Sequence, residues 1–311
     1  MYFLMTNDVE SFSIPLNKLD IHTAKEVYKV GLPRLLDIYS KHDIRCTFYF
    51  TGRLAEIVPE AVELVHEHGH DIGCHGYDHS PSRAFDLMNL EEQIEELQKA
   101  KNAIESIAGK IYDFRAPALR VNKDTIQALE KTGFNTDSSV ASQRFDGPLT
   151  FGSKKKLNWL VAPRSPYYPD YDSIFKKGNS KILEIPISSL VFSYIGSTMR
   201  ASPSTLRYLE KILFKESIIT GKPVLFLFHP NECLDPINGA KPVRRANNII
   251  EYIFADLVRH RLKTRNLGVK STLLLDNLIQ RAKDADFEFV TAQEYKRVRD
   301  SDAKIKIKRN D

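Results

Sequence analysis

Short apolar or alternating runs recur along the chain, with longer amphipathic stretches between them. Eight runs have the length and period of β-strands: residues 2–8, 46–51, 71–75, 111–115, 134–138, 182–186, 224–229 and 287–291. Apolar residues at three-to-four spacing predict helices over residues 24–42, 54–68, 90–108, 203–220, 245–261 and 270–283. Strands that alternate with helices predict an α/β fold, a distorted parallel β/α barrel that is open or closed.

Local signals mark some of the helix boundaries. Asn89, followed three residues later by Glu92, predicts a capping box at the start of the third helix. The sequence Gly31-Leu32-Pro33 indicates a break within the first.

Three stretches depart from the alternation. Residues 141–181 are rich in proline and tyrosine, which predicts an ordered loop. We interpret it as a substrate lid over the barrel mouth, with packing against a neighbouring helix as the alternative. Residues 235–270 carry many arginines and predict a basic helical insertion. Residues 300–311 are interpreted as a flexible basic tail.

The composition indicates one domain and excludes some classes of protein. With 311 residues and 42% hydrophobic content, the chain can bury one large core, so we predict a single domain over residues 1–311. The net charge of +5 is modest, and no zinc-finger spacing or aromatic-interleaved basic stripe indicates a nucleic-acid partner. No run approaches the roughly 18 apolar residues of a membrane span.

The cysteines and the N-terminus bear on the compartment. Cys46, Cys74 and Cys233 are an odd number without short spacing, which indicates a reducing environment. Strand parity directs Cys74 away from His75, so we expect it to be a small buried hydrophobe. No leader pattern precedes the candidate acids near position 8, and together these features predict a cytoplasmic protein.

Two histidines stand four residues apart at the end of the third predicted strand, in Gly73-Cys74-His75-Gly76-Tyr77-Asp78-His79. The even separation returns both imidazoles to one side, whether the backbone is extended or has begun a helix. A zinc-like hydrolytic site needs about three protein ligands and an open position for water. His75 and His79 are therefore two candidate ligands, and a carboxylate must arrive from elsewhere.

The first predicted strand supplies two carboxylates. It is an apolar run that ends in Asp8 and Glu10, whose equal parity places them on the same face. One of them can bind an ion and the other can act as a base.

Other predicted strands also end in ionisable residues. Arg115 stands at the end of the fourth strand, Asp137 at the end of the fifth and His229 at the end of the seventh. In β/α barrels the reactive groups lie at the carboxyl ends of the strands, which converge on one bowl. We therefore expect these side chains to lie close to the acids and the histidine pair.

The order of these motifs resembles the polysaccharide deacetylase family with the NodB-homology fold, carbohydrate esterase family four. The motifs are Thr6-Asn7-Asp8-Val9-Glu10, Cys74-His75-Gly76-Tyr77-Asp78-His79, Phe114-Arg115-Ala116-Pro117, Thr136-Asp137-Ser138-Ser139-Val140 and Leu227-Phe228-His229-Pro230-Asn231-Glu232. Their form resembles the branch associated with bacterial exopolysaccharide and lipopolysaccharide loci, and the similarity spans most of the chain.

The resemblance implies a distorted barrel that binds a divalent ion, usually zinc, through one acid and two histidines. Carried over to this chain, the ligands are His75, His79 and Glu10. Asp8 is then the base that activates the attacking water, and His229 protonates the leaving amine. Arg115 would hold Asp8 ionised and oriented.

The chain departs from the common family form in two places. Adjacent acids are usual, but Val9 occupies the second position here, so the ligand role moves to Glu10. Asp8 as the ligand, with an altered base, is the alternative. The family often has an acid-aromatic pair after the fifth strand that tunes the catalytic histidine, whereas Val140-Ala141 stand here. Asp137 is our candidate substitute.

The resemblance implies a metal-dependent N-deacetylase that acts on an N-acetylated sugar, and the absent leader favours a cytoplasmic glycan precursor. A related C-N hydrolase, such as an aminosugar deformylase or a cyclic amidohydrolase, is the nearer alternative. A catalytically silent carbohydrate-binding barrel is the alternative of a different class. The sequence leaves the sugar, the metal and the oligomeric state open.

Overall fold

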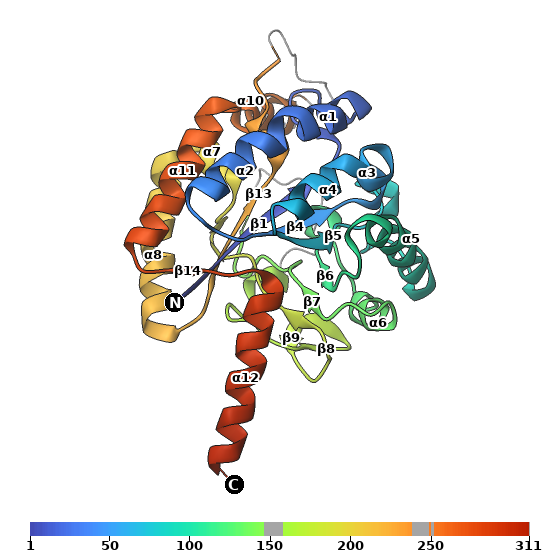
Figure 1. Ribbon diagram of the computed structural model, residues 1–311, viewed down its shortest axis with the longest axis vertical. Helices are drawn as coiled ribbons and strands as arrows, with labels where there is room; N and C mark the ends of the chain where they lie inside the picture. Colours follow the sequence, from blue (N-terminus) through green and yellow to red (C-terminus); the bar gives the residue numbers. More distant parts are fainter. Residues whose placement is uncertain (146–157, 238–248, 250–251, 311) are drawn as a thin grey trace.

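The computed structural model describes residues 1–145, 158–237, 249 and 252–310 and shows a curled parallel sheet surrounded by helices (Figure 1). Within these residues, the main sheet follows the order β10-β7-β6-β5-β4-β1-β13, with β14 paired to the start of β1. Its strands are β1 (Tyr2–Val9), β4 (Thr47–Phe50), β5 (Asp71–Cys74), β6 (Asp113–Phe114), β7 (Thr136–Asp137), β10 (Leu183–Glu184), β13 (Val224–Phe228) and β14 (Glu288–Phe289). All eight lie within the predicted runs, or extend one by a single residue, and the distorted β/α barrel is confirmed.

The register of the parallel strands decides which residues share the carboxyl rim. Val9 pairs with Phe50, which pairs with Cys74, and Cys74 pairs with Phe114, which in turn pairs with Asp137. The residues that follow these positions therefore reach the rim at one level, and they include Glu10, His75 and Arg115. On the other side of β1, Asn7 pairs with Phe228, which brings Asp8 level with His229.

An irregular segment after β10 bridges the two ends of the curled sheet. The Ser188 amide donates to the Leu225 carbonyl of β13, and the Leu225 amide donates to the Ser188 hydroxyl at 2.9 Å. Ile187 hydrogen-bonds back to Val140, beyond β7. Strands β11 (Ser189–Leu190) and β12 (Phe192–Ser193) form a small hairpin here. The barrel is therefore closed by a segment that forms only isolated hydrogen bonds with the neighbouring strands. This irregular closure is what distorts the barrel.

Helices pack around the outside of the sheet (Figure 1). They are α1 (Ile21–Glu26), η1 (Val27–Gly31), α2 (Leu32–Lys41), α3 (Gly52–Ile57), α4 (Pro59–Glu67), α5 (Leu90–Ala108), α6 (Thr125–Lys131), α7 (Gly196–Ala201), α8 (Pro203–Thr220), η7 (Tyr252–Val258), α10 (Arg259–Thr264), α11 (Val269–Asp284) and α12 (Ala292–Asn310). Within the described residues, none of these helices combines the length and apolar character needed to cross a bilayer.

The boundary signals hold with two refinements. The Asn89–Glu92 capping box forms as predicted. At the expected break, Gly31-Leu32-Pro33, a π-helical turn, η1, joins α1 to α2. Pro33 lies in the first turn of α2, where a residue without a backbone N–H is tolerated. The helix predicted over residues 54–68 is divided at Pro59 into α3 and α4.

The basic tail is helical, because the backbone of residues 300–310 continues helix α12 (Figure 1). This segment contains no proline or glycine and is rich in lysine and arginine, which favour helices. The predicted basic insertion contains η7 and α10, while residues 238–248 and 250–251 lie outside the described residues.

The described part of the tyrosine-rich stretch packs on helices. Strands β8 (Pro169–Asp170) and β9 (Ser173–Lys177) form a hairpin. The Tyr168 hydroxyl donates to Asp300 of α12, and the Tyr171 hydroxyl donates to Glu130 of α6. These contacts correspond to the alternative prediction of packing against neighbouring helices. Residues 146–157, where a lid would also fall, lie outside the described residues.

Candidate active site

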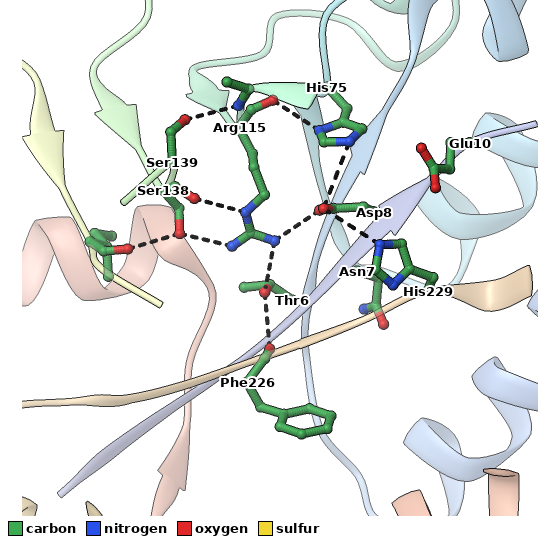
Figure 2. A network of polar contacts seen from close by, with 12 residues as sticks. Thr6, Asn7, Asp8, Glu10, His75, Arg115, Ser138, Ser139, Phe226 and His229 are labelled. Carbon is green, nitrogen blue, oxygen red and sulfur yellow. Dashed lines mark hydrogen bonds and ion pairs between the residues drawn. The ribbon is translucent and has the colours of Figure 1, made fainter. Parts of the chain in front are cut away.

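Asp8 occupies the centre of the candidate site, between Arg115, His75 and His229 (Figure 2). Strand parity directs Thr6 and Asp8 into the barrel, where both accept hydrogen bonds from Arg115. Asn7 faces outward and accepts a hydrogen bond from Tyr39 of α2. Alternation along one buried strand therefore separates the reactive face from the structural face.

Arg115 is fully buried, and each of its guanidinium nitrogens donates at least one hydrogen bond. Its guanidinium donates to Asp8 Oδ1 at 2.8 Å, to the Ser138 carbonyl at 2.9 Å and to the Ser138 hydroxyl at 2.8 Å. It also lies 4.4 Å from the centre of the Tyr49 ring. Burial alone would raise the pKa of Asp8, but Arg115, His75 and His229 outweigh it and hold that pKa below its usual range. Asp8 is therefore an ionised carboxylate with one oxygen, Oδ2, turned toward the histidines.

His75 presents one nitrogen to the site. Its Nδ1 lies 2.9 Å from the Arg115 carbonyl, which can only accept, so Nδ1 carries the hydrogen. Nε2 is then a lone-pair donor that lies 3.8 Å from Asp8 Oδ2. Burial lowers the pKa of His75, which favours the neutral imidazole that metals require.

Glu10 and His79 complete a cluster with His75. His79 Nε2 lies 3.4 Å from Glu10 Oε2, and one ligand atom from each of the three residues lies within 4.8 Å of the others. Glu10 Oε2 is buried and has no hydrogen-bond partner among the described residues. A carboxylate and two imidazoles, with one carboxylate oxygen left unpaired, fit a divalent ion such as zinc.

The turn between the two histidines depends on Gly76. Its φ of +68° lies in the left-handed region, and an added Cβ would lie 3.0 Å from the Pro117 ring. The chain can therefore reverse directly after His75 and bring His79 back to the same side.

His229 lies on the opposite side of Asp8 from Arg115. Its Nε2 is 3.9 Å from Asp8 Oδ2, and its Nδ1 is 3.0 Å from Glu232 Oε1. Burial alone would lower the pKa of His229, but Glu232, Asp8 and Glu10 outweigh it and raise that pKa to about 8. The ring is therefore charged at neutral pH and can give up a proton.

The structure groups six of the seven predicted residues directly and places Asp137 behind them. The Asp137 carboxylate accepts from the Ser139 hydroxyl, which itself accepts from the Ala116 amide next to Arg115. Among the described residues, the carboxylate that contacts His229 Nδ1 is Glu232, so Asp137 does not occupy the tuning position proposed for it. The spacing His229-Pro-Asn-Glu232, one helical turn, is the sequence signal that identifies Glu232.

Asp137 instead forms a buried carboxyl pair with Glu184. Burial raises the pKa of Asp137 to about 6 and that of Glu184 well above its usual range. Asp137 Oδ2 and Glu184 Oε2 each lack a donor among the described residues, while Glu184 Oε1 accepts from the Val140 amide. A single proton shared between the two carboxyl groups satisfies both oxygens.

This pair predicts a pH-dependent effect of Glu184→Gln. The folded protein keeps a proton that the unfolded chain releases near pH 4, so the wild-type free energy of unfolding falls as the pH rises through about 6. The glutamine amide can donate to Asp137 without a titrating proton. We expect the variant to gain stability relative to wild type between pH 5 and pH 8, by up to about 1.4 kcal/mol per pH unit.

Urea unfolding at pH 5 and pH 8 measures this difference. Glu63→Gln, on the exposed face of α4, is the control and should show little pH-dependent change. An equal effect of Glu184→Gln at both pH values would contradict the shared proton.

Comparisons with known proteins show which family this chain resembles. Residues 23–136 match the polysaccharide deacetylase family, a range that includes His75, His79 and Arg115. A peptidoglycan deacetylase of Helicobacter pylori is 30% identical over 118 residues, 38% of this chain and 39% of that protein. The chain spans less than half the length of the first curated relatives it matches.

Two further proteins extend the comparison. A probable 4-deoxy-4-formamido-L-arabinose-phosphoundecaprenol deformylase of Shewanella sediminis is 24% identical over 213 residues, 52% of this chain and 65% of that protein. A probable polysaccharide deacetylase from Pseudomonas aeruginosa has a similar fold, with a TM-score of 0.57, 14% identity and coverage of 94% of this chain and 89% of that one.

Proposed function

The chain belongs to the polysaccharide deacetylase family, and we propose that it is a metal-dependent hydrolase that removes an N-acetyl group from an aminosugar of a glycan or glycan precursor. One observation carries the proposal. An ionised, oriented carboxylate, Asp8, lies beside the Glu10–His75–His79 cluster and faces a protonated His229 across the same space.

Glu10, His75 and His79 would hold the ion. The unpaired Glu10 oxygen and the free Nε2 of His75 support this assignment over Asp8, whose Oδ1 is already bound by Arg115. When bound, a zinc-like ion acts as a Lewis acid on the amide carbonyl and makes water more acidic.

Asp8 and His229 supply the proton transfers of amide hydrolysis. Asp8 Oδ2 accepts a proton from the attacking water, because Arg115 holds its other oxygen and keeps the group ionised. His229 Nε2 donates a proton to the amide nitrogen as the C-N bond breaks, so the sugar leaves as a neutral amine. The Asp8 carboxylate and the His229 imidazole face each other, so one can accept a proton while the other donates one.

A formamide is the second candidate for the amide group. The relative from Shewanella sediminis is a probable deformylase of an aminosugar, and the same proton transfers serve a formyl group.

The free cysteines support a reducing compartment for this reaction. Cys46, Cys74 and Cys233 are all buried and unpaired, and Cys74 lies in the core as expected. Burial raises the pKa of the Cys74 thiol to about 12, which makes it a poor metal ligand. We place the reaction on a cytoplasmic glycan precursor on this basis.

We expect the zinc-loaded protein to release a free amine and one equivalent of acetate from N-acetylated aminosugars. Amine labelling and separate acetate and formate assays measure the products. Formate in place of acetate, from formamido sugars, would establish the deformylase alternative. Sugar binding with neither bound metal nor turnover would contradict both and favour a silent carbohydrate-binding barrel.

A further inference from the structure

A buried line of charged groups leads away from His229. Its Nδ1 contacts Glu232 Oε1 at 3.0 Å, and the second oxygen of Glu232 accepts from Nε of Arg200. Glu232 belongs to the short turn η6 (Pro230–Cys233), whereas Arg200 belongs to α7. Both side chains are almost completely buried.

Arg200 is fixed from both ends. Besides Glu232, its Nη1 donates to the backbone carbonyls of Lys263 and Arg265. Asn266 also donates to the Arg200 carbonyl at 2.8 Å. An arginine with these acceptors cannot turn away from Glu232 without leaving buried polar groups unpaired.

The backbone makes room for this carboxylate. A Cβ at Gly196, the first residue of α7, would overlap both oxygens of Glu232. The amide of Gly268 donates to the Glu232 carbonyl at 3.0 Å, which holds the same residue from a third direction. Helix α7, through Gly196 and Arg200, therefore defines where the Glu232 carboxylate lies, and Gly268 holds the backbone of the same residue.

We propose that Glu232, oriented by Arg200, is a positioning residue that fixes the ring of His229 with the hydrogen on Nδ1 and with Nε2 directed at Asp8. The role in catalysis rests on the proposed hydrolase function, but the ring orientation does not. A carboxylate can only accept, so it allows one arrangement at Nδ1. The proton that His229 exchanges is then always the one on Nε2.

A second buried ion pair, which does not contact His229, provides a comparison with Glu232 and Arg200. Glu210 and Arg281 form a comparable pair between α8 and α11, with Glu210 buried and bonded at 2.6 and 2.9 Å. That pair also binds a neighbouring hydroxyl, Tyr194, but contacts no residue of the site. Glu210 is therefore a matched control for removing a buried glutamate charge.

Glu232→Gln tests the proposal. The glutamine carbonyl must face Arg200, which only donates, so its amide group turns toward His229 and donates to Nδ1. We expect the neutral His229 ring to switch from the Nδ1–H to the Nε2–H tautomer, which ¹⁵N-histidine NMR detects directly. We also expect kcat to fall about 10- to 100-fold with KM within about two-fold, because the charged ring would direct Nδ1–H at another donor.

Two further variants keep the test decisive. Glu232→Asp retains the charge and should keep the Nδ1–H tautomer and recover part of kcat, whereas Glu210→Gln should change neither. Wild-type tautomer and kcat in Glu232→Gln would overturn the proposal. Wild-type protein without hydrolase activity would refute the proposed function alone, because the tautomer is read without any substrate.

Discussion

Glu10→Gln is expected to abolish stoichiometric zinc binding and to lower the hydrolytic rate at least about 1,000-fold. The amide oxygen is a weaker, neutral ligand, and a Lewis acid contributes several kcal/mol to such reactions. Glu10 is buried beside His79 and its Oε2 has no hydrogen-bond partner among the described residues, so little else is lost. Elemental analysis and amine release measure the two effects.

The control for this change is Glu67→Gln, an exposed glutamate at the end of α4. It should retain both the ion and the activity. If Glu10→Gln kept its zinc while Asp8→Asn lost it, the alternative assignment with Asp8 as the ligand would replace ours.

Asp8→Asn is expected to keep the zinc and lose about 100- to 10,000-fold in kcat, the usual contribution of a positioned base. The asparagine carbonyl can still accept a hydrogen bond from Arg115 Nη1, but its amide nitrogen cannot act as a base because its lone pair is delocalised. The two variants therefore separate ion binding from proton transfer. Measurements of kcat, KM and zinc content on one preparation decide between the roles.

This second change also carries a cost in stability. Arg115 is fully buried and 2.8 Å from Asp8, so the substitution leaves its charge without a counter-ion. We expect about 1 to 3 kcal/mol of destabilisation from the weakened hydrogen bond, measured by urea unfolding. A fully stable Asp8→Asn protein with wild-type kcat would exclude Asp8 as the base.

The eight strands could be predicted because buried parallel strands read as short apolar runs between helices. The grouping of ionisable residues at the strand ends could also be predicted, since a barrel places the carboxyl end of every strand at one rim. The capping box at Asn89 and the helix α8 followed from local signals alone. The helical backbone of residues 300–310 was not predicted, although the lysines and arginines of this segment favour helices.

Parity could not assign the two acids. Asp8 on β1 and Glu10 just beyond its end have equal parity, so their spacing permits either to meet the histidines. The register of β1 with β4 and of β4 with β5, and the hydrogen bond from Arg115 to Asp8, separate them in space. Glu232 was present in the quoted motif, but its contact with His229 depends on the turn η6 and on Arg200, which is 32 residues away.

The amino-acid sequence by itself determined the strands of the main sheet, most of the helices, their order and the set of side chains that reach the barrel rim, because these follow from local periodicity and from the direction of parallel strands. The tertiary structure decided which of those side chains meet, since contacts such as Asp8–Arg115, Glu10–His79 and Asp137–Glu184 join residues far apart in the chain. Their charges and hydrogen bonds depend on distances that no local pattern encodes.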